Sequence, residues 1–510
     1  VLTKTDFFVK PSDTNQINWY CCGPTVHAIT HIGHARTFII FDSMRKFMNS
    51  LGLKVNFGIN ITDIDDKINE KVRRKYYVQK LSTIGIVYDD DRLCSLSMDD
   101  MIRMLKLANF TDDELIPPNE IYQEFIKEKT DSFWETMEKI NVSPPTITMK
   151  VSEVIPDICE YIEKLVDMDY AYVSNGSVYF NTKKYEEEYG KCSLNNSTDD
   201  DINLKDGYVG DKRNIQDFAL WKKAKKYSIF FPSKWGDGTP GWHIECSVMS
   251  YIMFGDNIDI HSGGIDLKFP HHHNEILQSE SYCHKKNVFK HFIYTGHVCV
   301  PGGEKMAQSV GNYVSVDEYL KKYSVNSLRL LFWIVPWHRP LELSEDIIFQ
   351  AVTLEKRIND FIANIKYHLT LQQNLTKIPN TNNLVIMFDE IYDKLKKNFS
   401  TDLTIQSFNI LITQCNKALQ EKTFDNVEMS QVLSKTYDFL KIVGFQIVDQ
   451  SPDDSVHDNS GKFLAKLIDI RNFARKEKMY KMSDYIRDII VPDLGYRMQD
   501  MPDGTKIEKV

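Results

Sequence analysis

Residues 17–62 have the sequence INWYCCGPTVHAITHIGHARTFIIFDSMRKFMNSLGLKVNFGINIT, and this stretch decides the fold class. An apolar run is followed by a Gly-Pro turn, by apolar residues at helical spacing from Ile32 to Leu51, and by a second apolar run after Gly52. This order predicts a strand, a helix and a second strand. A helix that joins two such strands usually covers a parallel sheet. We therefore predict an α/β protein built on a parallel sheet.

A second α/β segment lies between residues 240 and 300. It contains the predicted strands DNIDIHSGG (256–264) and KHFIYTGHV (290–298), separated by the predicted helix HHHNEILQSESYC (271–283). We expect it to complete the first sheet. The intervening chain contains a predicted hairpin, AYVSNGSVYFNT (171–182), with Asn-Gly as its turn.

Two other regions differ from the α/β pattern. Residues 76–118 lose the apolar periodicity and carry the acidic cluster Asp89-Asp90-Asp91, which predicts an insertion that loops away from the core. After about residue 346 the chain becomes a series of amphipathic helices, which predicts a separate helical domain.

Composition narrows the class of protein. No apolar run approaches the roughly 18 residues of a membrane span, and the opening VLTKTDFFVK has no secretion signal, so we expect a cytoplasmic protein without membrane contact. Nine cysteines, two of them adjacent, do not suggest a disulfide framework. The net charge of −9 argues against general polyanion binding but leaves room for a local basic strip that binds RNA.

Metal-binding residue types cluster in the second α/β segment, where eight of the fourteen histidines fall between His243 and His297. His271 and Glu275 are four residues apart on a predicted helix and share one face. Cys246 lies just upstream, and Cys22 ends the first predicted strand, at the edge where open parallel sheets place their sites. Two thiolates, an imidazole and a carboxylate would form a tetrahedral zinc site. The alternatives are a buried apolar cysteine and a surface His-Glu pair; the absence of an HExxH pattern disfavours a hydrolytic zinc.

Two further motifs favour phosphate binding. His31-Ile32-Gly33-His34 begins the first predicted helix, where free backbone N–H groups and the helix dipole attract phosphate. The glycine-bearing loop PGGEKMAQSVGN (301–312) offers the mobile cation Lys305. Taken alone, the histidines could simply be polar residues in a first helical turn, and the lysine could be solvated.

Together these segments resemble class I aminoacyl-tRNA synthetases, specifically the cysteinyl-tRNA synthetase family in its eukaryotic-type form. HIGH stands at residues 31–34, and KMAQS at residues 305–309 takes the place of the family's KMSKS. The blocks NITDIDDKI, DKRNIQDFALWK, PGWHIECS, DLKFPHHHNEILQS and EKMAQSVGN are similar to family blocks and follow in family order, and the tail IRDIIVPDLGYRMQD resembles that of eukaryotic-type members. The resemblance covers nearly the whole chain except residues 76–118 and a polar loop near residue 200.

The resemblance implies a cysteine–tRNA ligase. Such an enzyme activates L-cysteine with ATP and Mg²⁺ to cysteinyl-adenylate and pyrophosphate, and then transfers cysteine to the 3′ end of tRNA(Cys). It selects the substrate thiolate through one zinc ion, because an ordinary pocket separates cysteine from the near-isosteric serine only about 10- to 200-fold. We therefore expect no editing domain.

Carried over by position, the family's site residues fall on these groups: zinc ligands Cys22, Cys246, His271 and Glu275; the cysteine pocket Gly23, Thr62, Trp242, Asp266 and His271; and the ATP contacts His31, Gly33, His34, Lys305 and Gln308, of which His31, His34 and Lys305 are catalytic. Trp242 would wall the pocket, and Asp266 would pair with the substrate ammonium. A basic run, Arg471, Arg475, Lys476 and Lys478, is a candidate tRNA contact whose alternative is the solvated face of an amphipathic helix.

The implied fold is a Rossmann-like parallel-sheet catalytic domain split by insertions, followed by an α-helical anticodon-binding domain and a short C-terminal tail domain. The expected parts are 1–75 (first catalytic half), 76–118 (family-divergent insertion), 119–210 (connective insertion domain), 211–300 (second catalytic half with the zinc site), 301–345 (KMSKS-type loop and stem-contact region), 346–450 (anticodon-binding bundle) and 451–510 (C-terminal tRNA-binding tail).

One departure from the family pattern leaves other functions open. Gln308 stands where the family carries a second lysine, and Ala307 replaces a serine. A catalytically silent tRNA-binding paralogue is one alternative, and a ligase that joins activated cysteine to a small amine is another. The intact HIGH motif opposes the first, and the helical domain opposes the second.

Overall fold

The computed structural model of the chain divides into two compact units, Val1–Gln446 and Ile447–Val510. It describes residues 15–86, 96–189, 211–306, 311–370, 383–421, 423–447, 456–491, 496–501 and 504–509. No helix within these ranges has the length and apolar character that crossing a membrane requires.

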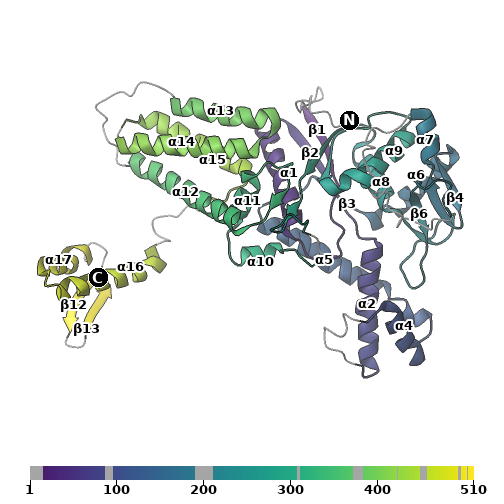
Figure 1. Ribbon diagram of the computed structural model, residues 1–510, viewed down its shortest axis with the longest axis horizontal. Helices are drawn as coiled ribbons and strands as arrows, with labels where there is room; N and C mark the ends of the chain where they lie inside the picture. Colours follow the sequence, from purple (N-terminus) through teal and green to yellow (C-terminus); the bar gives the residue numbers. More distant parts are fainter. Residues whose placement is uncertain are drawn as a thin grey trace. The chain divides into compact units, whose positions relative to one another are not determined.

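The core of the first unit is a five-stranded sheet in the order β3-β2-β1-β8-β9, with every neighbouring pair parallel. Its strands are β1 (Gln16–Cys21), β2 (Lys54–Ile61), β3 (Ile147–Lys150), β8 (Ile258–Gly264) and β9 (Phe289–Thr295). The two predicted α/β segments thus form one sheet (Figure 1), which confirms the predicted α/β class. Because β1 lies between strands from both halves, the ends of β1 and β8 form the point where the strand order reverses, and ligands bind at such points.

The first helix follows from its sequence. α1 (Ile32–Ser50) buries Ile32, Phe38, Ile39 and Phe41. Beyond its last turn the backbone of Gly52 takes φ +82°, a conformation that glycine adopts without a side-chain clash. Helix α1 lies beside the first strands in the view of Figure 1.

A smaller antiparallel sheet, in the order β4-β5-β6-β7, lies in the chain between the two halves. Its strands are β4 (Ala171–Ser174), β5 (Ser177–Phe180), β6 (Ala219–Lys223) and β7 (Gly238–Pro240), and its helices are α6 (Ile155–Asp167) and α7 (Thr182–Tyr189). The predicted Asn-Gly hairpin is present, with Asn175 at φ 49° and Gly176 at φ 84°, as tight hairpin turns require.

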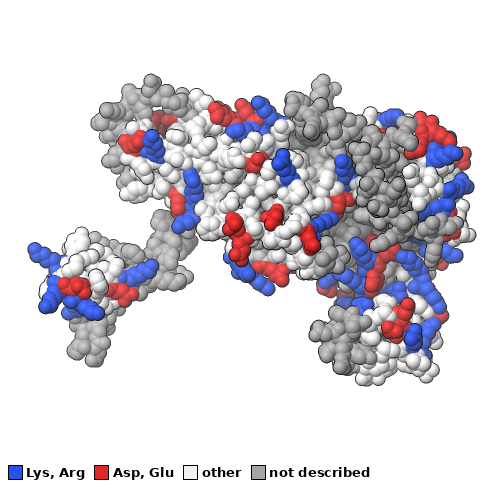
Figure 2. All heavy atoms as spheres, in the orientation of Figure 1, with Lys and Arg blue, Asp and Glu red and all other residues white. Residues whose placement is uncertain are grey.

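The stretch from residue 76 to 118, predicted as an insertion that loops away from the core, contains helices that were not predicted. Helix α2 (Asp66–Thr83) runs through residue 76, and α4 (Met98–Leu107) and the short helix η1 (Asp113–Leu115) follow it. Tyr77, Leu81 and Leu105 are among the buried residues of a local apolar cluster that packs these helices together. The sequence pattern was obscured because lysines and arginines separate these apolar residues. Figure 2 shows Lys and Arg side chains gathered around α2 and α4, and Asp89-Asp90-Asp91 lies outside the described residues.

Helices complete the first unit. α8 (Trp242–Phe254), the helical turn η6 (Lys268–His272) and α9 (His273–Cys283) flank β8, and α5 (Asn119–Lys139) precedes β3. The remaining elements are the helical turns η2 (Val151–Glu153) and η5 (Ile265–Leu267), the short strands β10 (Val298–Cys299) and β11 (Leu341–Glu342), and the helices α10 (Val316–Leu320), α11 (Val325–Ile334), α12 (Glu345–Thr370), α13 (Asn383–Asn398), α14 (Thr401–Glu421) and α15 (Asn426–Val443). The last four form the predicted helical region. Buried Arg329 of α11 joins this region to α1, because it pairs with Asp42 at 2.6 Å and donates to the carbonyl of Val443 at the end of α15.

The second unit is small. It contains α16 (Val456–Lys476), α17 (Tyr480–Tyr485), the helical turn η7 (Ile486–Ile490) and the antiparallel hairpin of β12 (Tyr496–Met501) and β13 (Gly504–Lys509). Leu467, Ile486, Val491 and Met498 form its apolar core.

Candidate active site and metal centre

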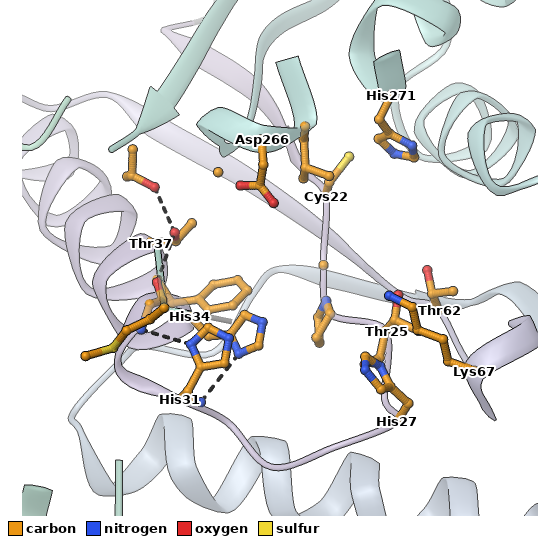
Figure 3. A pocket seen from close by; sticks show the side chains of 18 of the residues that line it. Cys22, Thr25, His27, His31, His34, Thr37, Thr62, Lys67, Asp266 and His271 are labelled. Carbon is orange, nitrogen blue, oxygen red and sulfur yellow. Dashed lines mark hydrogen bonds between the residues drawn. The ribbon is translucent and has the colours of Figure 1, made fainter. Parts of the chain in front are cut away.

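A cavity of about 660 Å³ opens at the carboxyl ends of the central strands. Figure 3 shows Cys22, Asp266 and His271 on one part of its wall and His31 and His34 on another. Its lining includes Cys22, Gly23, His31, Gly33, His34, Thr62, Trp242, Cys246, Asp266, His271 and Lys305. Residues predicted from both halves of the chain therefore meet in one cavity.

The four predicted metal ligands come together at the buried end of this cavity. Sγ of Cys22 lies 3.6 Å from Sγ of Cys246 and 3.6 Å from Oε1 of Glu275. Nε2 of His271 lies 3.0 Å from the same oxygen of Glu275. All four ligand atoms lie within 4.8 Å of one another, and all four side chains are buried. Two sulfurs bound tetrahedrally to zinc at about 2.3 Å would lie about 3.8 Å apart, close to the observed separation.

Each ligand is placed by a different element. Cys22 directly follows β1, Cys246 lies in the second turn of α8, His271 lies in η6, and Glu275 lies in the first turn of α9. The contact between His271 and Glu275 shows that their side chains lie on one face, as predicted.

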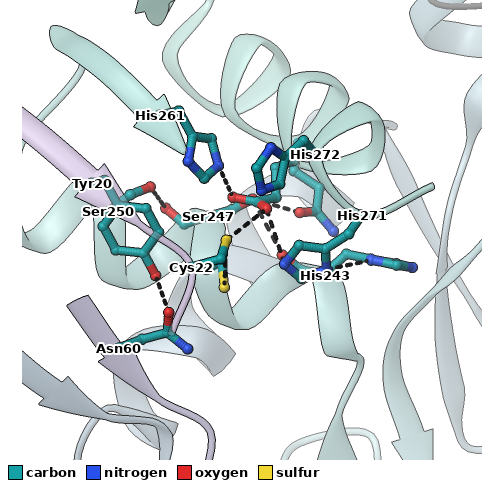
Figure 4. A network of polar contacts seen from close by, with 12 residues as sticks. Tyr20, Cys22, Asn60, His243, Ser247, Ser250, His261, His271 and His272 are labelled. Carbon is teal, nitrogen blue, oxygen red and sulfur yellow. Dashed lines mark hydrogen bonds and ion pairs between the residues drawn. The ribbon is translucent and has the colours of Figure 1, made fainter. Parts of the chain in front are cut away.

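Two histidines that were not predicted as site residues, His243 and His261, contact the metal ligands (Figure 4). Nδ1 of His243 lies 3.0 Å from Nδ1 of His271, which leaves Nε2 of His271 facing the cluster. Nε2 of His261 lies 2.8 Å from Oε2 of Glu275. Such partners orient metal ligands and fix their tautomers. The clustering of histidines was the only sequence signal for them.

A second ligand set shares two members with the first. Cys22, His261, His272 and Glu275 also place their ligand atoms within 4.8 Å of one another. This set has one sulfur instead of two, and His272 also approaches the hydroxyl of Tyr294 at 3.0 Å. Because zinc sites favour thiolates, the set with two cysteines is the better zinc site.

The electrostatics of the cluster suit a cation. Burial, followed by the neighbouring Cys246, raises the pKa of the Cys22 thiol, and burial raises that of Cys246. Burial lowers the pKa of His271 and keeps its imidazole neutral. Without a positive charge the thiols stay protonated, whereas a dication would stabilise both thiolates and accept the neutral imidazole. The donor set therefore fits zinc.

The HIGH histidines are neutral donors rather than cations. The backbone N–H of Gly33 donates to Nδ1 of His31 at 3.1 Å, and the backbone N–H of His31 donates to Nδ1 of His34 at 3.5 Å. Each Nδ1 is thus an acceptor, so each proton lies on Nε2. Burial, followed by the charge of Lys305, lowers the pKa of His31 to about 4; burial, followed by His31, lowers that of His34 to about 3.

Close packing explains the glycine of this motif. The two imidazole rings stack with centroids 3.8 Å apart. A Cβ at Gly33 would lie 2.8 Å from Cε1 of His31, so a side chain there would push the ring away.

Lys305 and Asp266 face each other across the cavity mouth. Nζ of Lys305 lies 3.4 Å from Oδ2 of Asp266, and about half of each side chain is exposed. An exposed pair of this kind separates at little cost, so both groups can turn to charged ligands. Gln308 lies outside the described residues.

Two of the remaining pocket residues, Gly23 and Thr62, are hydrogen-bonded to Asn60, which was not predicted as a site residue. The N–H of Gly23 donates to Oδ1 of Asn60 at 2.7 Å, and Nδ2 of Asn60 donates to Oγ1 of Thr62 at 3.0 Å. The ring of Trp242 lies 4.4 Å from that of His271 and forms part of the wall. Asn60 thus holds the chain beside Cys22 in place.

The candidate tRNA contacts lie in the second unit. Arg475 and Lys476 are exposed in the last turn of α16, and Lys478 is exposed just beyond it. Arg471 is only 1% exposed, so its expected place in a surface patch is wrong. It lies on the face of α16 that packs inward, close enough to Asp488 to influence its pKa.

Comparisons with known proteins agree with this geometry. A family model described as "tRNA synthetases class I (C) catalytic domain" matches residues 8–353. The cysteine–tRNA ligase of Methanococcus maripaludis (strain C7) is 34% identical over 100% of this chain and 98% of its own length. The cytoplasmic cysteine–tRNA ligase of Homo sapiens is 30% identical over 98% of this chain and 80% of its own. The solved Mycobacterium tuberculosis methionyl-tRNA synthetase in complex with methionyl-adenylate shares the fold, with a TM-score of 0.53 at 13% identity over 84% of this chain and 89% of that one.

Proposed function

This chain belongs to the class I tRNA synthetases of the (C) family, and from that membership we propose that it is a cysteine–tRNA ligase that selects its amino acid through zinc. It uses ATP with Mg²⁺, L-cysteine and tRNA(Cys). The zinc assignment is supported by one observation: the ligand atoms of Cys22, Cys246, His271 and Glu275 lie within 4.8 Å of one another.

The reaction has two steps. The cysteine carboxylate attacks the α-phosphorus of ATP, and pyrophosphate leaves. A hydroxyl of the terminal tRNA ribose then attacks the carbonyl carbon of the adenylate, and AMP leaves. Neither step needs a nucleophilic side chain, so catalysis comes from positioning and from stabilising charge on the phosphates.

The chain's own residues supply that stabilisation. The geometry supports His31 and His34 as neutral Nε2–H donors to phosphate oxygens, with the start of α1 beside them. Lys305 adds a mobile positive charge at the cavity mouth. Asp266 pairs with the substrate ammonium when Lys305 turns to ATP, and Trp242 and Thr62 bound the pocket.

Selection rests on the four buried ligands. Zinc bound there would prefer the readily ionised thiol of cysteine to the hydroxyl of serine. Glu275 provides the hard oxygen ligand that most easily gives way to a substrate sulfur. Discrimination at this step removes the need for an editing domain.

The test is the variant Cys246→Ser, with Cys283→Ser as its control, because Cys283 ends α9 outside both ligand sets. We expect Cys246→Ser to fold but to lose zinc and cysteine-dependent pyrophosphate exchange, since a hydroxyl is a poor zinc ligand. Cys283→Ser should keep both. Zinc-free Cys246→Ser protein with full exchange activity would refute the zinc assignment.

The other parts of the chain take the roles that the family suggests. We propose that helices α12–α15 read the anticodon region and that Arg475, Lys476 and Lys478 contact the tRNA backbone. We also propose a cytoplasmic location, as the name of the human relative states for that protein. Charge reversal at the three basic residues should weaken tRNA binding most at low salt.

A further inference from the structure

One face of α2 places three positively charged side chains in the lining of the active-site cavity. Lys67, Lys71 and Arg74 follow one another at intervals of four and three residues and therefore share one side of the helix. All three line the cavity that is also lined by three of the proposed zinc ligands, Cys22, Cys246 and His271, and by the HIGH histidines. Lys67 and Lys71 are exposed, and Arg74 is half-buried. We call these three residues the α2 basic face.

The α2 basic face lies apart from the groups assigned to ATP. In Figure 3, Lys67 lies beside Thr25, Thr62 and His27, whereas His31 and His34 lie across the cavity. Nζ of Lys71 donates to the carbonyl of His27 at 2.9 Å, which fixes it on the same side. The cavity thus has two regions that can bind phosphate, the neutral HIGH histidines with Lys305 and the α2 basic face, and the adenylate reaction accounts only for the first.

The α2 residues that line the cavity carry more positive than negative charge. Glu70 is the one carboxylate among the helix residues that line the cavity there, against three cations, in the part of the chain that the structure describes. Burial, followed by the positive charge of Lys129 on α5, lowers the pKa of Lys71. Positive charges held this close to one another favour a polyanion as their partner.

We propose that the α2 basic face binds the phosphates of the single-stranded 3′ end of the tRNA and guides the terminal ribose to the adenylate. This proposal rests on the proposed function, because only a tRNA-charging enzyme must admit an RNA end to this cavity. Lys67 and Lys71 lie about 6 Å apart along the helix axis, and Arg74 lies a further 4.5 Å or so along it. Three cations in a row can therefore follow a strand that leaves the cavity.

The experiment uses the full-length double variant Lys67→Glu/Lys71→Glu. Both side chains are exposed, so the change should leave the fold intact, and Lys67→Ala/Lys71→Ala serves as a milder second variant. The control is Lys183→Glu/Lys184→Glu on α7, which makes the same change of charge away from the cavity lining. Each protein is assayed for cysteine charging of tRNA(Cys) and for binding of tRNA(Cys) with and without its last four nucleotides.

We expect the double variant to charge tRNA(Cys) with kcat/KM roughly tenfold lower than wild type, and the control to stay within about twofold. The salt slope of binding to intact tRNA should fall by about 1.4, since each single-strand phosphate contact contributes about 0.7. Binding of the trimmed tRNA should be the same for variant and wild type. Equal losses with intact and trimmed tRNA, or no loss with either, would overturn the proposal.

Cysteine-dependent pyrophosphate exchange separates this proposal from the proposed function. A wild-type protein without exchange would refute the proposed function itself. A second outcome is that the wild type catalyses pyrophosphate exchange and the double variant loses as much of this exchange activity as of its tRNA-charging activity. This outcome would show that the α2 basic face binds ATP or pyrophosphate. That second result would refute the acceptor-end proposal alone.

Discussion

Arg36 lies in the second turn of α1, and its buried guanidinium ties that helix to two later segments of the chain. Nη1 donates to the carbonyls of Gly296 at 3.0 Å and His297 at 2.8 Å, and Nη2 donates to those of Pro336 at 3.2 Å and Arg339 at 2.7 Å. Gly296 and His297 line the active-site cavity. We predict that Arg36 holds the HIGH helix against the strand end that leads to Lys305.

The expected effect of Arg36→Met can be worked from these contacts. Four hydrogen bonds from a charged donor contribute about 1.5–3 kcal/mol each, or about 6–12 kcal/mol together. Burial lowers the pKa of Arg36 from 12.5 to about 10, which corresponds to a desolvation cost of about 3 kcal/mol that the variant recovers. The net expectation is a loss of roughly 3–9 kcal/mol in the free energy of unfolding.

Urea unfolding followed by tryptophan fluorescence measures this loss. The matched control is Arg45→Met on the same helix, because Arg45 donates to two carbonyls instead of four within the described part of the chain, those of Ser143 and Pro144, and is partly exposed. Arg36→Lys should be intermediate, since one ammonium cannot reach both pairs of carbonyls. If Arg36→Met loses less than about 1 kcal/mol, or no more than Arg45→Met, the reasoning is wrong.

Three further predictions concern residues assigned to substrate binding. A Cβ at Gly23 would lie 1.7 Å from the carbonyl oxygen of Asn60, so Gly23→Ala should displace the neighbouring metal ligand and lower zinc content and melting temperature together; a variant with both unchanged would contradict this. Histidines in the unfolded chain have a pKa of about 6.5, whereas His31 and His34 have lower pKa values in the folded protein. Below pH 6.5 the unfolded chain therefore binds more protons than the folded chain, so the free energy of unfolding should fall as pH drops from 6.5 towards 4. Because both histidines stay neutral, kcat/KM for ATP should not change with pH near 6.5 through their protonation. A change in kcat/KM near pH 6.5 that disappears in the variant His31→Asn would contradict the assignment of these histidines as neutral donors. Gln308→Lys should speed pyrophosphate exchange by about one to two orders of magnitude, and an unchanged rate would mean that another cation already compensates.

The central fold was predictable because its signals are local. Helical periodicity after Gly-Pro predicted α1, and Asn175-Gly176 predicted the hairpin. The helices within residues 76–118 were not predicted, because their apolar residues become a core only when α2 and α4 pack together, which is a tertiary contact. The buried position of Arg471 was hidden for a similar reason, since a basic residue on an amphipathic helix usually faces solvent.

The site was predictable where spacing or family position fixed it. His271 and Glu275 meet because they are four residues apart across the continuous helical turns of η6 and α9, whereas the meeting of Cys22 with Cys246 depends on the parallel pairing of β1 with β8. Neither spacing nor family position predicts His243, His261 or Asn60, because the roles of these residues depend on their contacts with site residues rather than on a motif. The neutral state of the HIGH histidines likewise required the hydrogen bonds of the folded helix end.

The most direct test of the central claim is the charging of tRNA(Cys) with cysteine and with serine by one preparation whose zinc content is measured on the same sample. We predict one zinc ion per chain, a preference for cysteine well beyond the roughly 200-fold limit of an ordinary pocket, and loss of activity on chelation with recovery on adding zinc. Full cysteine charging by zinc-free protein, with serine still rejected, would contradict the claim.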